Sequence, residues 1–430
     1  MKTITKPIII YVDALRRDLL IASVIQALLK KRGFISFLVS RNTHKSCIKF
    51  IKPSLYIIIK NFLKNFEQDI INYIDKSDIF IIDAEGAMTA ERCRVHLSQF
   101  GLKFKEIIKI VKLAFIWNKS FQDFTVENGA KKNQTIITGS PKIGLSKYIN
   151  KINKTKPKLN KIGFVGRFSV INNFNKDTAL SISLNRYQSY DTFKRGAIGE
   201  LEVLNIYYNL IEKIIDETDF IISIKPHPNE SIQSWDILKN KFGNRIEICK
   251  PEIDFLEWMF TVDKIVTTPS TSIVEPLLNQ IPIISIHKIM GGSTMHTYYE
   301  DMLDGLLESV EAPKNEDELF LLVKKKLIKT SEVKNKTKKT LKDFYNITDD
   351  DYAGYNFFDK FFEEIINKYK PSKIHKIVSG YYYLYYAILN YLKFLKASYL
   401  RNSNLFDYNF NYFATKKSPI IKRIVKLIDE

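Results

Sequence analysis

Cysteine is scarce in this chain, which has only Cys47, Cys93 and Cys249 among its 430 residues. They are far apart and odd in number, so they indicate neither a disulfide framework nor a cysteine-based metal site. Reduced thiols are the simpler interpretation, and we expect a cytoplasmic protein. Long apolar runs are also missing. No stretch reaches the roughly 20 apolar residues that a membrane span needs, and the apolar run within residues 1–18 is too short for a signal peptide and predicts a first strand.

The sequence shows no internal repeat and no nucleic-acid-binding motif. Its charge is nevertheless strongly positive, with 66 Lys and Arg against 47 Asp and Glu, a net charge of +19. Nucleic acid, an anionic membrane or an acidic substrate would each suit this charge, and a compositional bias towards Lys, Ile and Asn would also produce it. We expect no nucleic-acid partner, because the charge is dispersed outside the C-terminal segment.

Short apolar runs alternate with stretches of helical periodicity, which is typical of open parallel sheets in α/β proteins. In the first half, strands are predicted at 7–12, 34–39, 79–82, 113–117 and 135–138, with a helix over 19–31. In the second half, strands are predicted at 161–165, 220–225, 245–248, 264–266 and 283–286, with helices over 197–217, from Ser270 and over 315–329. Residues 146–160 are rich in Lys and Asn and predict a linker.

The segment 371–430 differs in kind, with ten Lys or Arg, three acids and many aromatic residues. A basic, aromatic helix suits an anionic membrane interface. The alternative is that its tyrosines pack against the second domain as closing helices. We therefore predict three parts: two Rossmann-like domains over 1–150 and 158–345, and a helical extension over 346–430.

Two polar turns in the second half predict a phosphate pocket. The strand 220–225 ends in Lys225, Pro226, His227 and Pro228, and the run 264–266 leads to a helix that opens with Ser270, Thr271 and Ser272. If these strands are adjacent and parallel, both turns lie at the carboxyl edge, where open α/β sheets bind ligands. The helix start would offer N–H groups to a phosphate. The two prolines would fix the position of the imidazole, and Lys225 would add a cation.

Each of these residues also has a plainer interpretation. His227 could simply stabilise its turn. The three hydroxyl residues could form an ordinary N-cap. Glu275, one turn further along, could bind ribose hydroxyls or only interact with the helix dipole.

Acidic residues follow a predicted strand of the first half, in Asp83-Ala84-Glu85-Gly86. Gly86 lets the chain turn sharply, and a carboxylate there could act as general base or as nucleophile toward an anomeric carbon. We favour Glu85, because Asp83 could instead bond to backbone in the turn. Arg16 and Arg17 could hold an acidic sugar or an acceptor carboxylate, or be solvated charges.

A metal is not expected. Metal-assisted diphosphate donors usually need an Asp-x-Asp triplet at a strand end, and the one such triplet, 349–351, lies beyond both domains. Phosphate charge would be met by Lys225, His227 and the helix start.

In combination, the acidic-Gly turn, the His-Pro turn and the Ser/Thr pair resemble the three motifs of bacterial sialyltransferases and Kdo transferases. The longer pattern is closer still to surface carbohydrate biosynthesis proteins over residues 8–290. It comprises Arg17-Asp18-Leu19, Asp83 to Gly86, Trp117 with Gln122, Thr138 to Pro141, Phe168-Ser169 with Asn172, Lys225 to Glu230, and Thr271 to Glu275.

The resemblance implies the glycosyltransferase B-fold, with two Rossmann-like domains facing a cleft. It implies Glu85 as the catalytic carboxylate, with Asp83 as its rival, and places His227 and Ser270 to Ser272 on the donor phosphate. Pro228 and Ser169 lie in its nucleotide and sugar motifs. Two departures concern the donor sugar: Ala84 stands where sialyltransferases have a second acid, and residues 165–169 replace an Asn-rich loop.

The resemblance therefore implies a glycosyltransferase for capsule, lipopolysaccharide or a related surface glycan. A CMP-activated acidic sugar is the favoured donor substrate, a glycan or lipid-linked molecule is the acceptor, and no cofactor is expected. The first domain would bind the acceptor, the second the nucleotide, and the extension would attach the protein to the inner face of the cytoplasmic membrane.

Three alternatives stay open. A polyol-phosphate transferase using CDP-glycerol would depend on a first-domain histidine, His44 or His96. A nucleotide-sugar 2-epimerase would share the fold and need no acceptor. A basic RNA-binding protein would bind independently of both polar turns.

Overall fold

The computed structural model divides the chain into two compact units. Unit 1 comprises residues 1–148 and 341–430, and unit 2 comprises residues 149–340. The structure describes residues 1–13, 15–40, 43–60, 77–84, 89, 93–94, 104–153, 160–173, 190–250, 253–290, 300–325, 333–347, 357–399 and 418–429. The segment 346–430, predicted as a separate extension, groups with the first sheet.

Unit 1 is built on a six-stranded parallel sheet in the order β3-β2-β4-β5-β6-β7. The strands are β2 (Ile8–Val12), β3 (Ser36–Ser40), β4 (Leu55–Lys60), β5 (Asp78–Asp83), β6 (Val111–Ile116) and β7 (Thr135–Ile137). Strands β2 to β4 are buried at every position, as expected of a parallel sheet covered on both faces. Strand β4 has no counterpart among the predicted strands, because its short apolar run cannot be told from a buried helix segment by periodicity.

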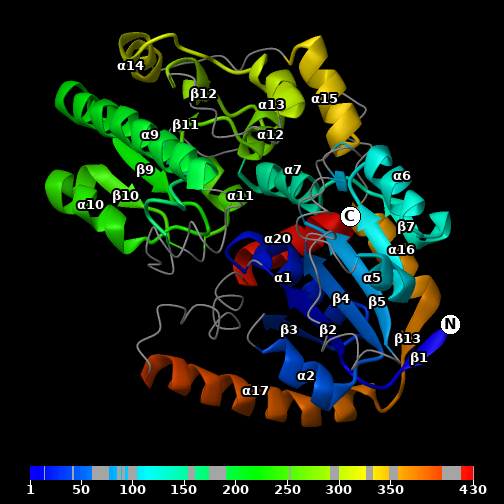
Figure 1. Ribbon diagram of the computed structural model, residues 1–430. Coiled ribbons are helices and arrows are strands. Elements are labelled where there is room, and N and C mark those ends of the chain that lie inside the picture. The colour runs from blue at the N-terminus through cyan, green and yellow to red at the C-terminus, as the bar shows by residue number, and fades with distance from the viewer. Residues whose placement is uncertain are drawn as a thin grey trace. The chain divides into compact units, whose positions relative to one another are not determined.

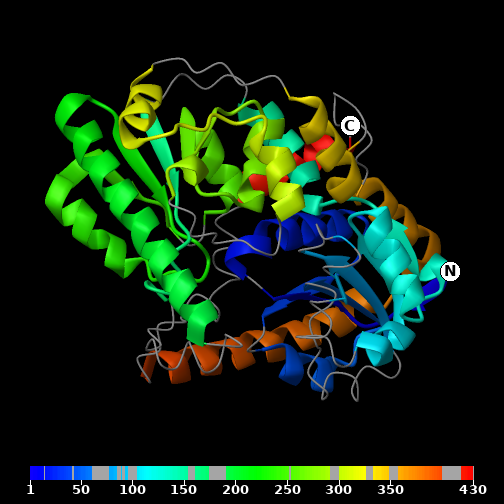
Figure 2. The same ribbon diagram turned by 45° about the horizontal axis from the view of Figure 1, so that its top comes forward.

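Helices cover both faces of this sheet. They are α1 (Leu15–Lys31), α2 (His44–Ile51), α5 (Phe104–Ile110), α6 (Lys119–Glu127), α16 (Phe357–Lys368), α17 (His375–Tyr399) and α20 (Ser418–Asp429). Two views agree that α1 and α20 lie on one side of the β3 end of the sheet, and α2 and α17 on the other (Figures 1 and 2).

The residues between the two units are helical. Helix α7 (Pro141–Asn153) spans the boundary at residue 148, and α15 (Asn335–Tyr345) spans the one at residue 340. The predicted linker is therefore wrong over 146–153. Ile143, Leu145 and Ile149 of α7 are buried among its lysines, and this apolar face stabilises a helix that the Lys-rich composition conceals.

The C-terminal segment packs on unit 1. Strand β1 (Lys2–Ile4) pairs in parallel with β13 (Tyr369–Pro371). The Tyr369 hydroxyl donates to Asp78 at 2.8 Å, and Tyr386 stacks on Phe37 with ring centroids 5.5 Å apart. The alternative in which the tyrosines of 371–430 close the second domain is therefore wrong for Tyr386.

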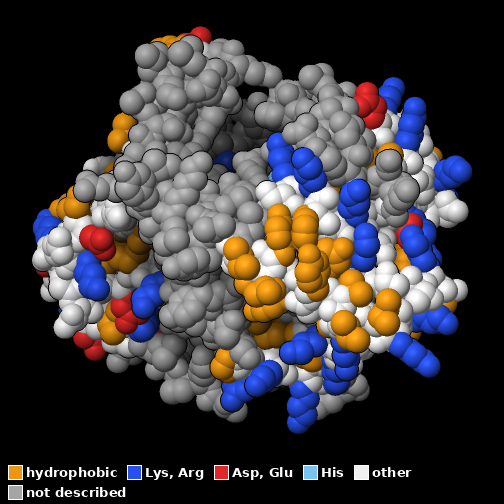
Figure 3. Space-filling view, turned by 90° about the horizontal axis from the view of Figure 1, so that it is seen from below, with side chains coloured by type: hydrophobic (Ala, Val, Ile, Leu, Met, Phe, Trp, Pro, Cys, Tyr) orange, Lys and Arg blue, Asp and Glu red, His pale blue; other side chains and the backbone are white. Residues whose placement is uncertain are grey.

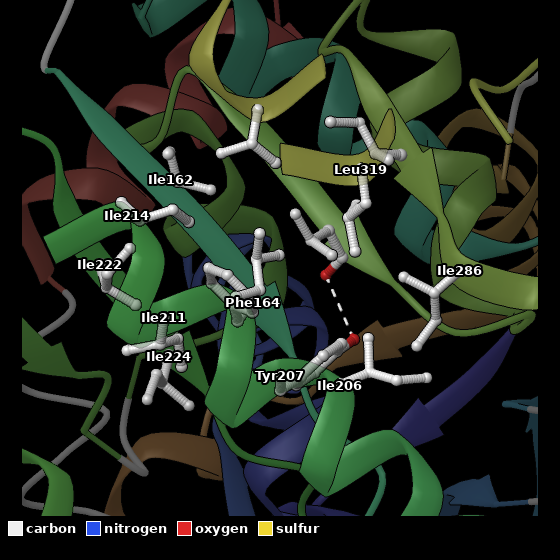
Figure 4. Close-up of a cluster of buried hydrophobic side chains, with 14 of the residues drawn as sticks. Ile162, Phe164, Ile206, Tyr207, Ile211, Ile214, Ile222, Ile224, Ile286 and Leu319 are labelled. Carbon is white, nitrogen blue, oxygen red and sulfur yellow. Dashed lines mark hydrogen bonds between the residues drawn. The ribbon is translucent and has the colours of Figure 1, made fainter. Parts of the chain in front are cut away.

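Unit 2 contains a five-stranded parallel sheet in the order β10-β9-β8-β11-β12. Its strands are β8 (Lys161–Val165), β9 (Ile221–Lys225), β10 (Ile246–Ile248), β11 (Lys264–Thr267) and β12 (Ile283–Ser285), and its helices include α9 (Tyr190–Glu217), α10 (Asp236–Phe242), α11 (Phe255–Trp258), α12 (Val274–Leu278), α13 (Glu300–Leu307) and α14 (Glu316–Lys324). Figure 4 shows the core between α9 and the sheet. There the rings of Phe164 and Tyr207 pack edge to face, with their centroids 5.1 Å apart.

The strands before the two polar turns, β9 and β11, are not adjacent as predicted, because β8 lies between them. Gly163 of β8 makes room for Trp258, since a Cβ there would lie 2.7 Å from the indole ring. The same indole donates to the Ser223 hydroxyl of β9 at 2.9 Å. Because all five strands are parallel, both turns still lie at the carboxyl edge of the sheet.

Candidate functional site

The His-Pro turn follows β9 at the carboxyl edge of unit 2. The Asn229 backbone N–H donates to His227 Nδ1 at 3.2 Å, and the Glu230 N–H donates to the His227 carbonyl at 2.9 Å. A neutral ring in this turn therefore carries its proton on Nε2. The ring is half-buried, and Nε2 is the atom that could donate to a bound anion.

Glu230 ties this turn to the loop after β8. It is fully buried, and its Oε1 accepts from the backbone of Phe168 at 2.8 Å and of His227 at 3.1 Å. Its Oε2 accepts from Trp235 Nε1 at 3.0 Å. Burial raises the pKa of Glu230 to about 7, although the three N–H donors lower it. One carboxyl group thus fixes the carboxyl ends of two neighbouring strands.

The loop over 166–173 approaches Glu230 closely. A Cβ on Gly166 would lie 2.9 Å from the Phe168 ring and 3.3 Å from Glu230 Oε1. Further along, the Asn172 side chain donates to the Ser231 carbonyl, and the Ser231 N–H donates to the Asn172 carbonyl, both at 3.0 Å. Ser169, predicted to contact sugar, is held half-buried within this loop.

A second carboxyl group, Glu200 of α9, supports the same loop. It accepts from the backbone of Val170 and Ile171, both at 2.9 Å. Burial raises its pKa to about 7, and the charge of Glu230 adds to the effect. Sequence reasoning missed Glu200, although it continues the buried stripe of Val203 and Tyr207. An acid in line with an apolar helix face was the available signal.

The second polar turn forms a shorter helix start than predicted. Ser270 is the N-cap residue, and its hydroxyl accepts from the Ser272 N–H at 3.2 Å. A 3₁₀ turn (Thr271–Ile273) follows, and α12 has only five residues. The helix dipole is correspondingly small. Thr271 is exposed, and Ser272 and Glu275 are half-buried, so the N-cap is an observed role and phosphate binding stays a prediction.

Lys225 is placed differently from what the phosphate prediction requires. Its ammonium group bonds to the Ile253 carbonyl and lies 3.5 Å from Cys249 Sγ. Burial raises the pKa of the Cys249 thiol, and the lysine opposes that shift. Pro228 is half-buried within the His-Pro turn.

Unit 1 has a charged cluster at the carboxyl edge of its own sheet. Arg17 holds Asp18 with two nitrogens, Nε at 2.9 Å from Oδ1 and Nη2 at 2.7 Å from Oδ2, a bidentate geometry. Burial disfavours the charge of Arg17, but Asp18, Asp13 and Asp83 together raise its pKa above the ordinary value. The side chain of Arg16 and all of Glu85 lie outside the described residues.

Asp83 ends β5 and is 1% exposed. Trp117 Nε1 donates to its carbonyl at 2.8 Å. Burial, with the nearby charge of Asp83, raises the pKa of Cys93 to about 12. Asp83 is therefore a buried counter-charge to Arg17, and the catalytic role of Glu85 or Asp83 stays a prediction.

Two histidines lie near carboxyl ends of strands and carry no role in the leading prediction. His287 follows β12, and its Nδ1 lies 2.9 Å from the Ser285 hydroxyl. Burial lowers its pKa. His44 begins α2 just after β3, is 1% exposed, and meets the Tyr11 ring edge to face at 4.9 Å. His96 and the 349–351 triplet lie outside the described residues.

Two negative findings hold for the described residues alone. Within them, no three His, Cys, Asp or Glu side chains are grouped so that they could hold a metal. Nor does any described helix combine the length and apolar character needed to cross a bilayer.

No protein-family model matches the chain, and no curated protein matches it in sequence. Solved structures do resemble it. The wall teichoic acid polymerase TagF, in a structure with CDPG, has a TM-score of 0.50 at 10% identity, covering 85% of this chain and 90% of the polymerase. The Methanocaldococcus jannaschii UDP-GlcNAc 2-epimerase has a TM-score of 0.47 at 12% identity, covering 83% and 99%, and S. aureus MnaA with UDP has 0.46 at 11%, covering 85% and 99%.

The likeness to TagF concerns the fold. It confirms the predicted class: an α/β protein with two parallel sheets of the glycosyltransferase B type and a helical C-terminal region.

Proposed function

We propose that this protein is a glycosyltransferase of bacterial surface-glycan synthesis, acting in the cytoplasm with a nucleotide sugar as donor. A CMP-linked acidic sugar, such as Kdo or a sialic-type acid, is the favoured donor, and a glycan or lipid-linked molecule is the acceptor. No cofactor and no metal take part in this proposal. The basic, aromatic C-terminal segment would hold the enzyme at an anionic membrane surface.

The observation that carries the proposal is the set of hydrogen bonds by which the buried Glu230 carboxyl group accepts from the backbone of Phe168 and His227. It fixes the His-Pro turn and the 166–173 loop side by side at the carboxyl ends of β9 and β8, the place where open α/β sheets bind nucleotides. His227 Nε2 would donate to a phosphate oxygen of the donor. Because the turn is built before any ligand arrives, binding would cost little reorganisation.

Roles in unit 1 follow from its charged cluster. Glu85 would act on the reacting carbon or on the acceptor hydroxyl. Arg17 is already held by Asp18, so a sugar carboxylate would share the guanidinium with that partner. Arg16 stays a candidate for the same anion.

A thermal-shift series with CMP, CDP, UDP and GDP on the full chain tests the nucleotide. Bound nucleotide stabilises the folded protein by about 2.7 kcal/mol at 100 times its dissociation constant. A shift with CMP that the other three fail to produce is the expected result. No shift with any of the four would overturn the proposed nucleotide site.

The polyol-phosphate transferase remains a second candidate, because a first-domain histidine does lie at the carboxyl edge of unit 1. His44 is buried against Tyr11, whose hydroxyl donates to Asp13. A shift with CDP in place of CMP, together with loss of turnover in His44→Asn but not in Glu85→Gln, would select this candidate. Epimerisation without any acceptor would select the nucleotide-sugar 2-epimerase.

A further inference from the structure

Unit 1 contains a cavity of about 820 Å³ that the proposed reaction does not use. It lies where the C-terminal half of α1 and the edge strand β3 meet α17 and α20. Lys30, at its wall, is roughly 20 Å along the α1 axis from Arg17. The Lys30 end of the cavity is therefore well removed from the charged cluster at the carboxyl edge of the same sheet.

The lining of this cavity combines an apolar wall with cations. Phe37, Tyr386, Ile421 and Val425 contribute to the apolar part. Four lysines also line it: Lys30 and Lys31 from α1, and Lys422 and Lys426 from α20. Among the described lining residues there is no Asp or Glu. An anionic amphiphile would match both the apolar wall and the cationic side chains of this lining.

Helix α17 indicates where such a ligand comes from. Ile374, Ile377, Tyr381, Leu384 and Ile388 are each more than half exposed, and their spacing of three and four residues puts them on one stripe. The opposite face of the helix is docked on unit 1. Figure 3 shows hydrophobic side chains gathered on this surface with Lys and Arg around them. Tyr383, also on α17, lines the cavity.

The charge of the segment argues against a second copy of the chain as the partner of this stripe. No acidic residue occurs between Glu364 and Asp407, so two such helices would bring like charges together. An anionic lipid surface is the partner that this charge favours, since Lys and Arg side chains are attracted to its headgroups.

We propose that this cavity binds one anionic phospholipid. The phosphate of its headgroup lies among the four lysines, and the first part of one acyl chain covers the apolar wall. The lipid comes from the anionic membrane surface proposed above, but binding at the cavity needs neither the nucleotide nor catalysis. Experiments can therefore disprove lipid binding at the cavity without disproving the proposed transfer reaction, and the reverse.

Calorimetry of the full-length protein with dihexanoylphosphatidylglycerol, kept monomeric below its critical micelle concentration, tests the cavity directly. Lys422→Glu with Lys426→Glu should weaken binding at least tenfold. Lys105→Glu with Lys109→Glu is the matched control, because both lysines are exposed on α5 and neither lines the cavity. Equal loss of lipid affinity in both double variants, or no loss of lipid affinity in either, would overturn the proposal.

Three further arms define the ligand. Inorganic phosphate and dihexanoylphosphatidylcholine should each bind at least tenfold more weakly than the anionic lipid. Equal binding of phosphate would mean a simple anion site, and equal binding of the choline lipid a simple apolar one; either result overturns the proposal. Ala27→Trp, which fills the cavity from α1, should abolish soluble-lipid binding in protein whose circular dichroism is unchanged.

The stripe on α17 needs its own control. Ile377→Ser with Leu384→Ser should reduce sedimentation with phosphatidylglycerol vesicles and leave the affinity for the soluble lipid within twofold. If this variant instead loses the soluble lipid and keeps the vesicles, the stripe and not the cavity is the lipid site.

Discussion

The carboxyl edges of the two sheets are organised in opposite ways. In unit 1, a guanidinium and several carboxylates neutralise one another. Arg17 forms an ion pair with Asp18, and the charge of Asp83 lies close by. In unit 2, the buried carboxyl groups of Glu200 and Glu230 accept backbone N–H groups from the loops after the strands. The first edge is therefore held by ion pairing between side chains, and the second by side chains that fix backbone.

This difference suits different tasks. An edge of paired charges can present a carboxylate or a guanidinium to a reacting group. Removing one of the charges lowers the stability of that edge. An edge of fixed loops presents donors in set positions, as an anion site requires. Four experiments test the contrast: three substitutions in order of decreasing expected effect, followed by a pH series.

Glu85→Gln should abolish transfer and leave nucleotide affinity unchanged. General acid–base groups contribute about 10²–10⁴-fold to rate, so turnover should fall by that factor. Steady-state kinetics and calorimetry measure the two quantities, with Glu106→Gln on α5 as the control for loss of one carboxylate. Near-normal transfer by Glu85→Gln, with Asp83→Asn inactive, would move the role to Asp83.

Arg17→Met should destabilise unit 1 by about 3–5 kcal/mol, because it leaves buried carboxylates without their cation. Arg94→Met is the matched control. Arg94 pairs with Glu127, and both side chains are more than half exposed, so its loss should cost no more than about 1 kcal/mol. Urea unfolding compares the two variants, and equal midpoints would show that the Arg17 cluster does not hold this edge together.

His227→Ala should weaken nucleotide binding by about 1.5–3 kcal/mol, the usual contribution of a hydrogen bond to a charged group. Asn229→Ala is the control, since it changes the exposed neighbour but keeps the backbone N–H that the turn uses. Calorimetry with the nucleotide that gives the thermal shift measures both. Unchanged affinity in His227→Ala would remove the phosphate role from this turn.

Unit 2 should lose stability as pH rises towards neutrality. The folded pKa values of Glu200 and Glu230 are raised to about 7, above the roughly 4.3 of an unfolded Glu. The folded state therefore holds protons more tightly. Their contribution is fully present below about pH 4.3 and is lost as pH rises through about 7, at up to about 1.4 kcal/mol per pH unit and group.

Denaturant unfolding at pH 5 and pH 8 measures this loss. Trp235 donates to Glu230, so tryptophan fluorescence reports on the region. Glu200→Gln with Glu230→Gln should flatten the profile. An unchanged pH dependence in that double variant would mean that other groups cause it.

Local patterns predicted much of this architecture. Alternating apolar runs indicated two parallel sheets, and the short motif around His227 indicated a turn at a carboxyl edge. Features that depend on distant partners escaped prediction. Strand β8 lies between β9 and β11, and Gly163 of β8 makes room for an indole from α11. Nothing near Gly163 in the sequence reveals that contact.

The candidate site was predictable to a similar extent. His227 and Ser270 stand out as motifs, whereas Glu200 contributes only because α9 carries it beneath a loop thirty residues earlier in the chain. Lys225 looked like a phosphate ligand from its spacing, yet the carbonyl of Ile253 receives its ammonium group. Spacing shows which residues share a turn and does not show which way a long side chain points.

The pairing of β1 with β13 has a consequence for how the protein is made. Lys2 and Tyr369 lie in register on neighbouring strands, so the ribosome produces one member of this pair long before the other. All of unit 2 is synthesised in between and can fold first, while β1 waits without its partner. Because contacts between distant segments close slowly, the nascent chain would expose the unpaired backbone edge of β1 during that interval.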